Sequence, residues 1–200
     1  MPLMARVQKA VAETIRLQQQ FLQEEGGTVV AAARMLAGAF QAGARVFIFG
    51  NGGSAADAQH LAAEFVNRFQ VERPPLAALA LTTDTSILTA VANDYDFNEV
   101  FAKQLQALGR PGDVAWGIST SGGSPNVVRG LKVARELGLK TLAFCGRDGG
   151  EVALAADIAL IVRSRNTPRV QEVHITIGHV LCDLVDYQLY PEKFGAEAGR

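Results

Sequence analysis

The sequence has little of what several large classes of protein depend on. No apolar run approaches the ~18 uninterrupted residues of a membrane-spanning helix, and the opening segment alternates charged and apolar residues instead of carrying a signal-peptide core. We therefore expect a cytoplasmic protein without a membrane partner. The two cysteines, Cys145 and Cys182, lie too far apart for a CxxC site. We expect two buried thiols, not a disulfide framework.

An excess of basic charge is also missing. Nineteen Lys and Arg residues stand against 20 Asp and Glu residues, for a net charge of −1, so the sequence does not favour direct binding of nucleic acid. Neither glycine-rich loop ends in GKS or GKT, and the GxGxxG pattern is absent. The sequence therefore supports neither a P-loop nucleotide site nor a dinucleotide site.

What the sequence does contain is an alternation of helical and strand patterns. Short apolar runs at 45–50, 76–81, 113–119, 140–146 and 157–163 are typical of buried strands, and helical patterns at 54–69, 85–92, 97–108, 125–137 and 168–189 separate or follow them. Such alternation predicts an α/β domain, over residues 44–191, built on a parallel sheet with helices on both faces. Residues 192–200 are expected to form a loose tail.

The first 43 residues have a different pattern. Val7, Val11 and Ile15 form a helical stripe that continues to Leu22, and Gly26-Gly27 interrupts it before a second helical stretch. We predict an N-terminal helical hairpin over residues 1–43. Its stripe either serves oligomerisation or packs on the domain itself, and the pattern alone does not separate these two uses.

Two loops that follow predicted strands carry candidate ligand groups. Gly50-Asn51-Gly52-Gly53-Ser54, the first glycine loop, would let a ligand approach the backbone, with Ser54 as helix N-cap and Asp57 as its capping-box partner. Residues 119–124, the serine loop, bring four hydroxyls to a helix that begins at Pro125. A phosphate fits there without a lysine, because a helix N-terminus favours anions. A tight turn and an ordinary helix cap are the alternatives.

Two of the three histidines lie near carboxylate or amide side chains at helical spacing. His60 and Glu64 are one turn apart, and His179 follows Gln171 by eight residues on the last predicted helix. Imidazole and carboxylate are normal zinc ligands, so these four residues could form a zinc-like site if the two helices meet. His60 and Glu64 could equally be a surface pair. We interpret His174 as a structural histidine.

Five segments, taken in order, resemble one known family. They are Gly50-Asn51-Gly52-Gly53-Ser54, AQHLAAE (58–64), Ala92-Asn93-Asp94, GISTSGGSPNV (117–127) and RVQEVHITIGH (169–179). This set is similar to the phosphoheptose isomerases of the sugar isomerase (SIS) superfamily, over nearly the whole chain. The resemblance implies a five-stranded parallel sheet flanked by helices, a homotetramer, one zinc ion per subunit, and heptose synthesis for lipopolysaccharide or related glycans.

The resemblance also implies roles for particular positions. It assigns the phosphate of a sugar-phosphate substrate to the serine loop, through Ser119, Thr120, Ser121 and Ser124. It assigns contacts with the open-chain sugar to Asn51, Gly52, Gly53, Asn93 and Asp94. The implied zinc ligands are His60, Glu64, Gln171 and His179, and Gln171 also faces the substrate. Glu64 and His179 would transfer protons between carbons 1 and 2 of the sugar through an enediol.

A related SIS protein offers an alternative of another class. It is a non-catalytic regulator that binds the replication initiator DnaA, and NRFQVERP (67–74) and LCDLVDYQLYP (181–191) resemble that branch at least as well. The presence of both Glu64 and His179 favours the enzyme.

Overall fold

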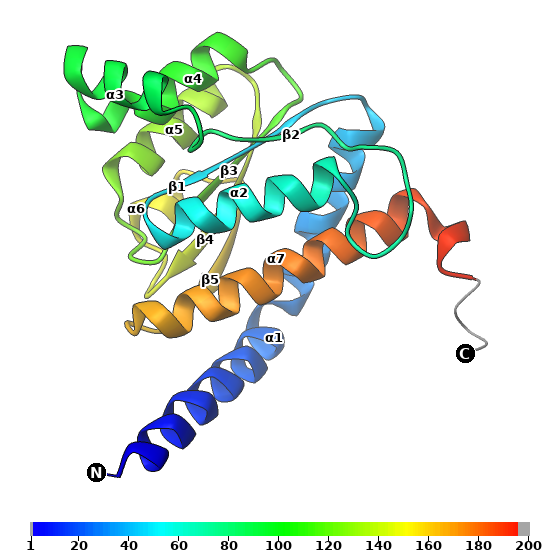
Figure 1. Ribbon diagram of the computed structural model, residues 1–200. Coiled ribbons are helices and arrows are strands. Elements are labelled where there is room, and N and C mark those ends of the chain that lie inside the picture. Colours follow the sequence, from blue (N-terminus) through cyan, green and yellow to red (C-terminus); the bar gives the residue numbers. More distant parts are fainter. Residues whose placement is uncertain (1, 196–200) are drawn as a thin grey trace.

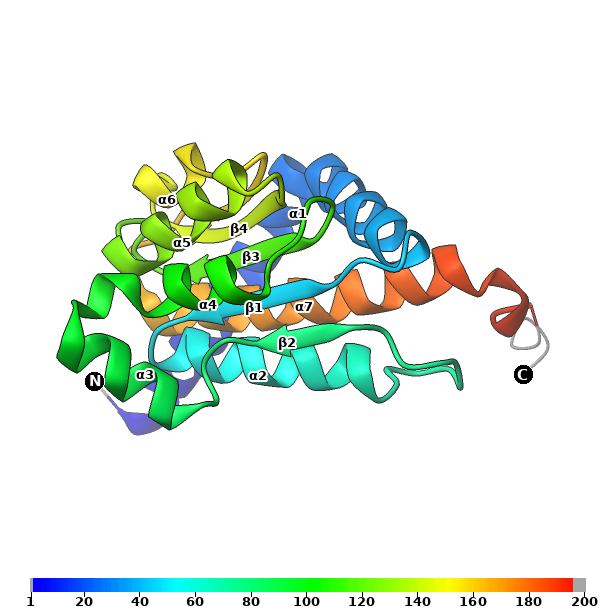
Figure 2. The same cartoon turned by 90° about the horizontal axis from the view of Figure 1, so that it is seen from above.

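Five parallel strands form the centre of the fold, in the order β2-β1-β3-β4-β5 (Figures 1 and 2). The structure, a computed structural model, describes residues 2–195. The strands are β1 (Val46–Gly50), β2 (Ala78–Ala80), β3 (Val114–Ser119), β4 (Lys140–Gly146) and β5 (Ile158–Val162). Side chains of β1 and β3 are buried throughout, as expected for a parallel sheet covered on both faces. The predicted α/β class and five strands are therefore confirmed.

Helices cover both faces of this sheet. One face carries α1 (Leu3–Gln41), α2 (Gly53–Val66) and α7 (Thr167–Leu189), and the other carries α3 (Thr85–Asp94), α4 (Val100–Leu108), α5 (Pro125–Glu136) and α6 (Gly150–Leu154). Short 3-10 turns span Phe97–Glu99 and Pro191–Lys193. Two apolar cores result, one around Trp116 and Phe144 and one around Phe49 and Phe101.

The predicted N-terminal hairpin is wrong. A single 39-residue helix, α1, runs through Gly26-Gly27 without a break. The reason lies in its buried stripe, since Phe21, Val29 and Leu36 continue one helical face across the glycines and pack into the core. A glycine inside a helix costs about 1 kcal/mol, and burial of this face outweighs that local cost.

The first half of α1 extends beyond the sheet and crosses α7 (Figure 1). Polar contacts join the two helices: Arg169 Nη1 donates to the carbonyl of Ala10 at 2.8 Å, and Gln18 Nε2 donates to Thr176 Oγ1 at 3.1 Å. The same half of α1 also carries six large apolar side chains that are exposed. They are Leu3, Met4, Val7, Val11, Ile15 and Leu22, and we call them the exposed stripe.

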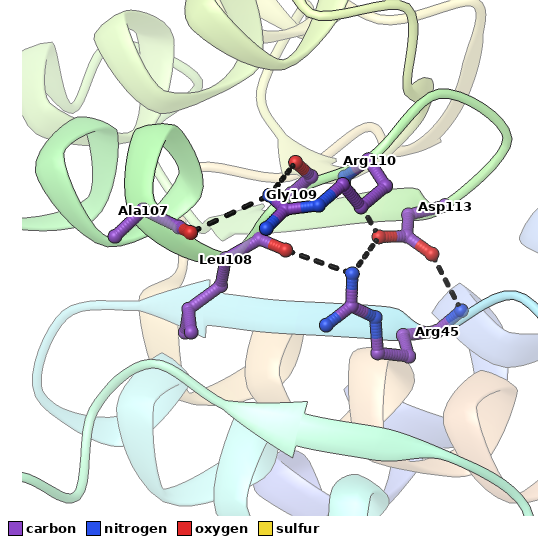
Figure 3. A network of polar contacts seen from close by, with 6 residues as sticks. All are labelled: Arg45, Ala107, Leu108, Gly109, Arg110 and Asp113. Carbon is purple, nitrogen blue, oxygen red and sulfur yellow. Dashed lines mark hydrogen bonds and ion pairs between the residues drawn. The ribbon is translucent and has the colours of Figure 1, made fainter.

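An ionic clasp closes the edge of the sheet where the strands begin (Figure 3). The carboxylate of Asp113 accepts hydrogen bonds from the backbone N–H of Arg45 at 2.8 Å and from that of Arg110 at 2.9 Å. Arg45 Nη2 lies 2.9 Å from Asp113 Oδ2 and also donates to the carbonyl of Leu108. These contacts are structural, so the candidate site is to be sought at the opposite, carboxyl edge.

Three further expectations concern the two cysteines, membrane-spanning helices and the C-terminal tail. Both cysteines are free and buried, as predicted, and burial raises the pKa of Cys145 to about 12. Within residues 2–195, no helix is long and apolar enough to cross a bilayer. The predicted tail begins inside the turn Pro191–Lys193, and its residues 196–200 lie outside the described part of the chain.

Candidate functional site

The first glycine loop leads into α2 without a capping box. Helix α2 begins at Gly53, and its N-cap is Gly52 in the left-handed region at φ +56°, without a side-chain cap. The predicted N-cap role of Ser54 is therefore wrong, because Ser54 already lies within the first turn and is buried. Asp57 consequently forms no capping box. The backbone of the loop stays open to a ligand.

A reciprocal amide pair fixes this loop against the next one. Asn51 Nδ2 donates to Asn126 Oδ1 and Asn126 Nδ2 donates to Asn51 Oδ1, both at 2.8 Å. Asn126 lies in the first turn of α5, is 2 % exposed and was not predicted from the sequence. The pair ties the carboxyl ends of β1 and β3 together.

The serine loop gathers three hydroxyls at the start of α5. Ser119 Oγ lies 2.8 Å from Ser124 Oγ and 3.4 Å from Ser121 Oγ. Ser124 is the N-cap residue before Pro125, as predicted, but its hydroxyl makes no capping bond and can turn to a ligand. Thr120 differs, since its carbonyl packs against Gly146. Hydroxyls and free amides at a helix N-terminus suit a phosphate.

Glycines hold the serine loop against the loop that follows β4. Gly122, Gly149 and Gly150 all have positive φ, and a Cβ on Gly122 would lie 2.5 Å from the carbonyl oxygen of Gly149. The carbonyl of Gly122 also accepts a hydrogen bond from the N–H of Val152 at 2.9 Å. The position of the hydroxyls therefore depends on residues after two different strands.

The two helices that carry the predicted metal ligands do meet. His60 Nε2 of α2 lies 2.8 Å from His179 Nε2 of α7 and 3.4 Å from Glu64 Oε1. One ligand atom from each of these residues lies within 4.8 Å of the other two. We call this group the His–Glu–His cluster. It joins side chains from two helices far apart in the sequence.

The cluster fits a zinc ion in donor type and in spacing. Catalytic zinc sites use three protein ligands of this kind and leave a fourth position open. Zinc binds histidine nitrogens at about 2.0–2.1 Å, so a tetrahedral ion would separate the two ring nitrogens by about 3.3 Å. The observed 2.8 Å needs only a small outward movement of the rings. His60 is exposed and His179 is half-buried, so both rings can make this movement.

Two further side chains border the cluster. Phe69, just after α2, places its ring 5.5 Å from the ring of His179. Asp57 lies one turn before His60, with one carboxylate oxygen buried and without a hydrogen-bond partner in the described residues. Burial raises the pKa of Asp57 to about 6, and the nearby His60 opposes that shift.

A buried arginine holds α2 against α7 behind the cluster. Arg73 Nη2 donates to the carbonyl of Glu64 at 2.9 Å and Nη1 donates to that of Phe65 at 2.6 Å, which caps the last turn of α2. Arg73 Nε donates to Asp186 Oδ1 of α7 at 2.8 Å, and both side chains are at most 1 % exposed. The sequence reading missed this pair because Arg73 lies in a loop without periodicity.

The remaining predicted residues are Gln171, near the start of α7, and Asn93 and Asp94, at the end of α3. The amide of Gln171 occupies the space that a side chain on Gly53 would need, with Nε2 1.9 Å from an ideal Cβ position there. Asn93 and Asp94 end α3 and are exposed. Asn93 Nδ2 donates to Asp94 Oδ1 at 2.8 Å. Within residues 2–195, neither forms a hydrogen bond with the serine loop or the cluster.

Comparison with known proteins adds independent information. A sequence model described as the SIS domain matches residues 11–146. The phosphoheptose isomerase of Nitratidesulfovibrio vulgaris is 58% identical over 89% of this chain and 86% of its own length. That of Aquifex aeolicus is 54% identical over 92% and 96%.

Solved structures agree with these sequences. The phosphoheptose isomerase from Neisseria gonorrhoeae has a TM-score of 0.87 and 45% identity, covering 92% of this chain and 99% of that one. The one from Francisella tularensis has a TM-score of 0.89 and 35% identity, covering 93% and 99%. The alternative of a DnaA-binding regulator gains no support from these relatives.

Proposed function

This chain belongs to the phosphoheptose isomerases of the SIS-domain family, and from that membership we propose that it converts D-sedoheptulose 7-phosphate to D-glycero-D-manno-heptose 7-phosphate. The observation that carries the proposal is the convergence of Glu64 of α2 and His179 of α7 in one His–Glu–His cluster. A ketose–aldose conversion needs two such proton-transfer groups on one substrate.

The reaction follows from this pair of side chains. Glu64 removes a proton from carbon 1, and His179 gives a proton to the carbonyl oxygen on carbon 2, which forms an enediol. Glu64 then returns the proton to carbon 2 while the hydroxyl on carbon 1 loses its proton to His179 and becomes the aldehyde. Both groups end in their starting states. The net change is the movement of hydrogen between two carbons and two oxygens.

The serine loop binds the other end of the substrate. Ser119, Ser121 and Ser124 donate hydrogen bonds to the phosphate, together with the backbone amides at the start of α5. Thr120 completes the loop. His60 lies seven residues into α2, about 10 Å from its start. In this proposal the open-chain sugar extends from the serine loop to the His–Glu–His cluster, and the sugar contacts are those predicted from the sequence, which are Asn51, Gly52, Gly53, Asn93, Asp94 and Gln171.

Zinc is the proposed cofactor, one ion per subunit. His60, Glu64 and His179 would hold it, with the amide oxygen of Gln171 as the fourth ligand. When bound, the ion supplies Lewis-acid polarisation of the sugar carbonyl. The support for it is the imidazole–carboxylate–imidazole donor set and its spacing.

We further propose a homotetramer in the cytoplasm that supplies heptose for lipopolysaccharide or a related glycan. The support for assembly is the exposed stripe, six large apolar side chains on one side of α1. A patch of this kind on a folded chain marks an interaction surface. The domain limits at residues 43/44 and 191/192 remain part of this proposal, with α1 as the assembling segment.

The proposed chemistry is tested by Glu64→Gln. Loss of the carboxylate removes the base without changing the side-chain shape, so turnover of sedoheptulose 7-phosphate should fall by at least about 100-fold. In deuterated water the wild-type product should carry deuterium at carbon 2. Glu72→Gln, on the exposed loop after α2, serves as control and should retain activity. Turnover that survives in Glu64→Gln would refute the assignment.

The metal proposal has a separate test. Protein purified without a histidine tag should contain one zinc ion per subunit by elemental analysis, and His60→Ala should lose it because one of the four proposed ligand side chains is gone. His174→Gln is the matched control, since His174 lies on α7 but outside the cluster. Equal metal content in wild type and His60→Ala would contradict the assignment.

A further inference from the structure

A large cavity opens next to the serine loop and is not used by the proposed reaction. Its volume is about 610 Å³, within the range of small-molecule sites. It lies at the ends of β4 and β5, where ligands bind in open parallel sheets. The lining residues are Ser121, Arg147, Asp148, Arg163, Ser164 and Arg165. We call this cavity the arginine pocket.

The arginine pocket has a net positive charge. Three arginines and one aspartate, Asp148, line it. Arg163 is paired, since its Nε lies 3.2 Å from Glu24 Oε2 of α1. The guanidinium groups of Arg147 and Arg165 make no ion pair or hydrogen bond with any residue between 2 and 195. Unpaired arginines around a cavity suit phosphoryl groups, whose oxygens match the planar fork of the side chain.

The backbone at Arg147 is held in an unfavourable conformation. Its φ is +59°, the only positive φ of a non-glycine residue within 2–195, and L side chains rarely adopt such a conformation. The N–H of Arg147 donates to the carbonyl of Ser164 at 3.0 Å, which joins the loop after β4 to the loop after β5. Strain of this kind concentrates at ligand sites.

The arginine pocket and the serine loop share a boundary. Ser121 lines the pocket, and its hydroxyl lies 3.4 Å from that of Ser119 in the serine loop. The close packing of Gly122 on Gly149 and Gly150 brings the two loops together. One ligand can therefore place one phosphoryl group on the serines and a directly bonded second one among the arginines. A sugar with phosphates at its two ends lacks such a direct phosphate–phosphate linkage.

We propose that the serine loop and the arginine pocket together bind diphosphates, and that these compete with the sugar phosphate. The inference rests on the proposed function in one respect, the phosphate site at the serine loop. A cavity of this size also leaves room beyond a diphosphate, so the ligand is either free pyrophosphate or a nucleoside diphosphate. Both share the phosphate–phosphate linkage that the site recognises.

Calorimetric titration at constant ionic strength tests the proposal without any need for turnover. Inorganic pyrophosphate should bind at least about 10-fold more tightly than inorganic phosphate, a difference of one decade in Kd. Saturating phosphate should displace it, because both use the serines. ADP binding as tightly as pyrophosphate would identify a nucleoside diphosphate as ligand, and ADP binding more weakly would identify free pyrophosphate. These binding results do not depend on whether the protein has isomerase activity.

A double variant and its control test how much the two unpaired arginines contribute to pyrophosphate binding. Arg147→Gln with Arg165→Gln should lower pyrophosphate affinity to that of phosphate and leave phosphate affinity within about twofold. Arg110→Gln with Arg135→Gln makes the same change in net charge away from the pocket and should leave the preference intact. The proposal is overturned if pyrophosphate binds no better than phosphate, if fructose 1,6-bisphosphate binds as well as pyrophosphate, or if both double variants behave alike.

Discussion

His174 shows how one buried side chain makes stability depend on pH. It is 2 % exposed, and its Nε2 lies 3.1 Å from the carbonyl oxygen of Cys145. The ring packs against Phe144, and its Nδ1 is buried without a partner in the described residues. Burial lowers the pKa of His174 to about 4. The structural role predicted for this histidine is consistent with these surroundings.

A lowered histidine pKa predicts acid sensitivity. The unfolded chain binds a proton at His174 below pH 6.5, and the folded chain does so only near pH 4. The free energy of unfolding therefore decreases as the pH falls between these values. The loss approaches about 3 kcal/mol at the lower end. Urea unfolding at pH 7 and pH 4.5 should therefore show a smaller acid loss in His174→Gln than in wild type. Equal losses would assign the acid sensitivity to other groups.

Single residues were predictable where the signal is local. The one-turn spacing of His60 and Glu64 follows from helix geometry alone, but their contact with His179 depends on how α2 packs on α7. The resemblance to a family supplied that link, and the geometry confirms it. Asn126 and Arg73 escaped prediction because each acts through a tertiary contact, with Asn51 and with Asp186, that no local pattern encodes.

At the scale of elements, the continuous α1 makes a sharp prediction about its glycines. Gly27→Ala should stabilise the protein by about 1 kcal/mol, because alanine favours the helix and a Cβ at Gly27 meets nothing within 4 Å. Gly43→Ala is the matched control, since its Cβ also meets open space but its φ is +73°. That variant should be destabilised. Midpoints of urea unfolding measure both, and a lower midpoint for Gly27→Ala would contradict a continuous helix.

Strands were easier to predict than the ends of helices. Apolar runs long enough to be buried on both sides mark β1, β3 and β4 to within about one residue at each end. The predicted run at 76–81 shortens to Ala78–Ala80, at the sheet edge after two prolines that cannot donate to a ladder. The five-residue α6 was missed, because one turn of helix is too short to show a period.

At the scale of the whole molecule, the exposed stripe predicts assembly through α1. Val11→Glu with Ile15→Glu places two charges on that surface, so the assembled mass should fall toward that of one chain. Leu154→Glu is the control, because Leu154 is 82 % exposed on α6, across the sheet. Light scattering after size-exclusion chromatography gives the masses. An unchanged mass for the double variant would place the interface elsewhere.

The ionic clasp of Asp113, Arg45 and Arg110 (Figure 3) fastens the sheet where β1 and β3 start. The glycine and serine loops follow the far ends of these two strands. Changes of side chain in those loops can therefore alter ligand preference while the ionic clasp stays intact. Selection can therefore vary specificity through the side chains of these loops, provided that the glycines that hold the serine loop are kept.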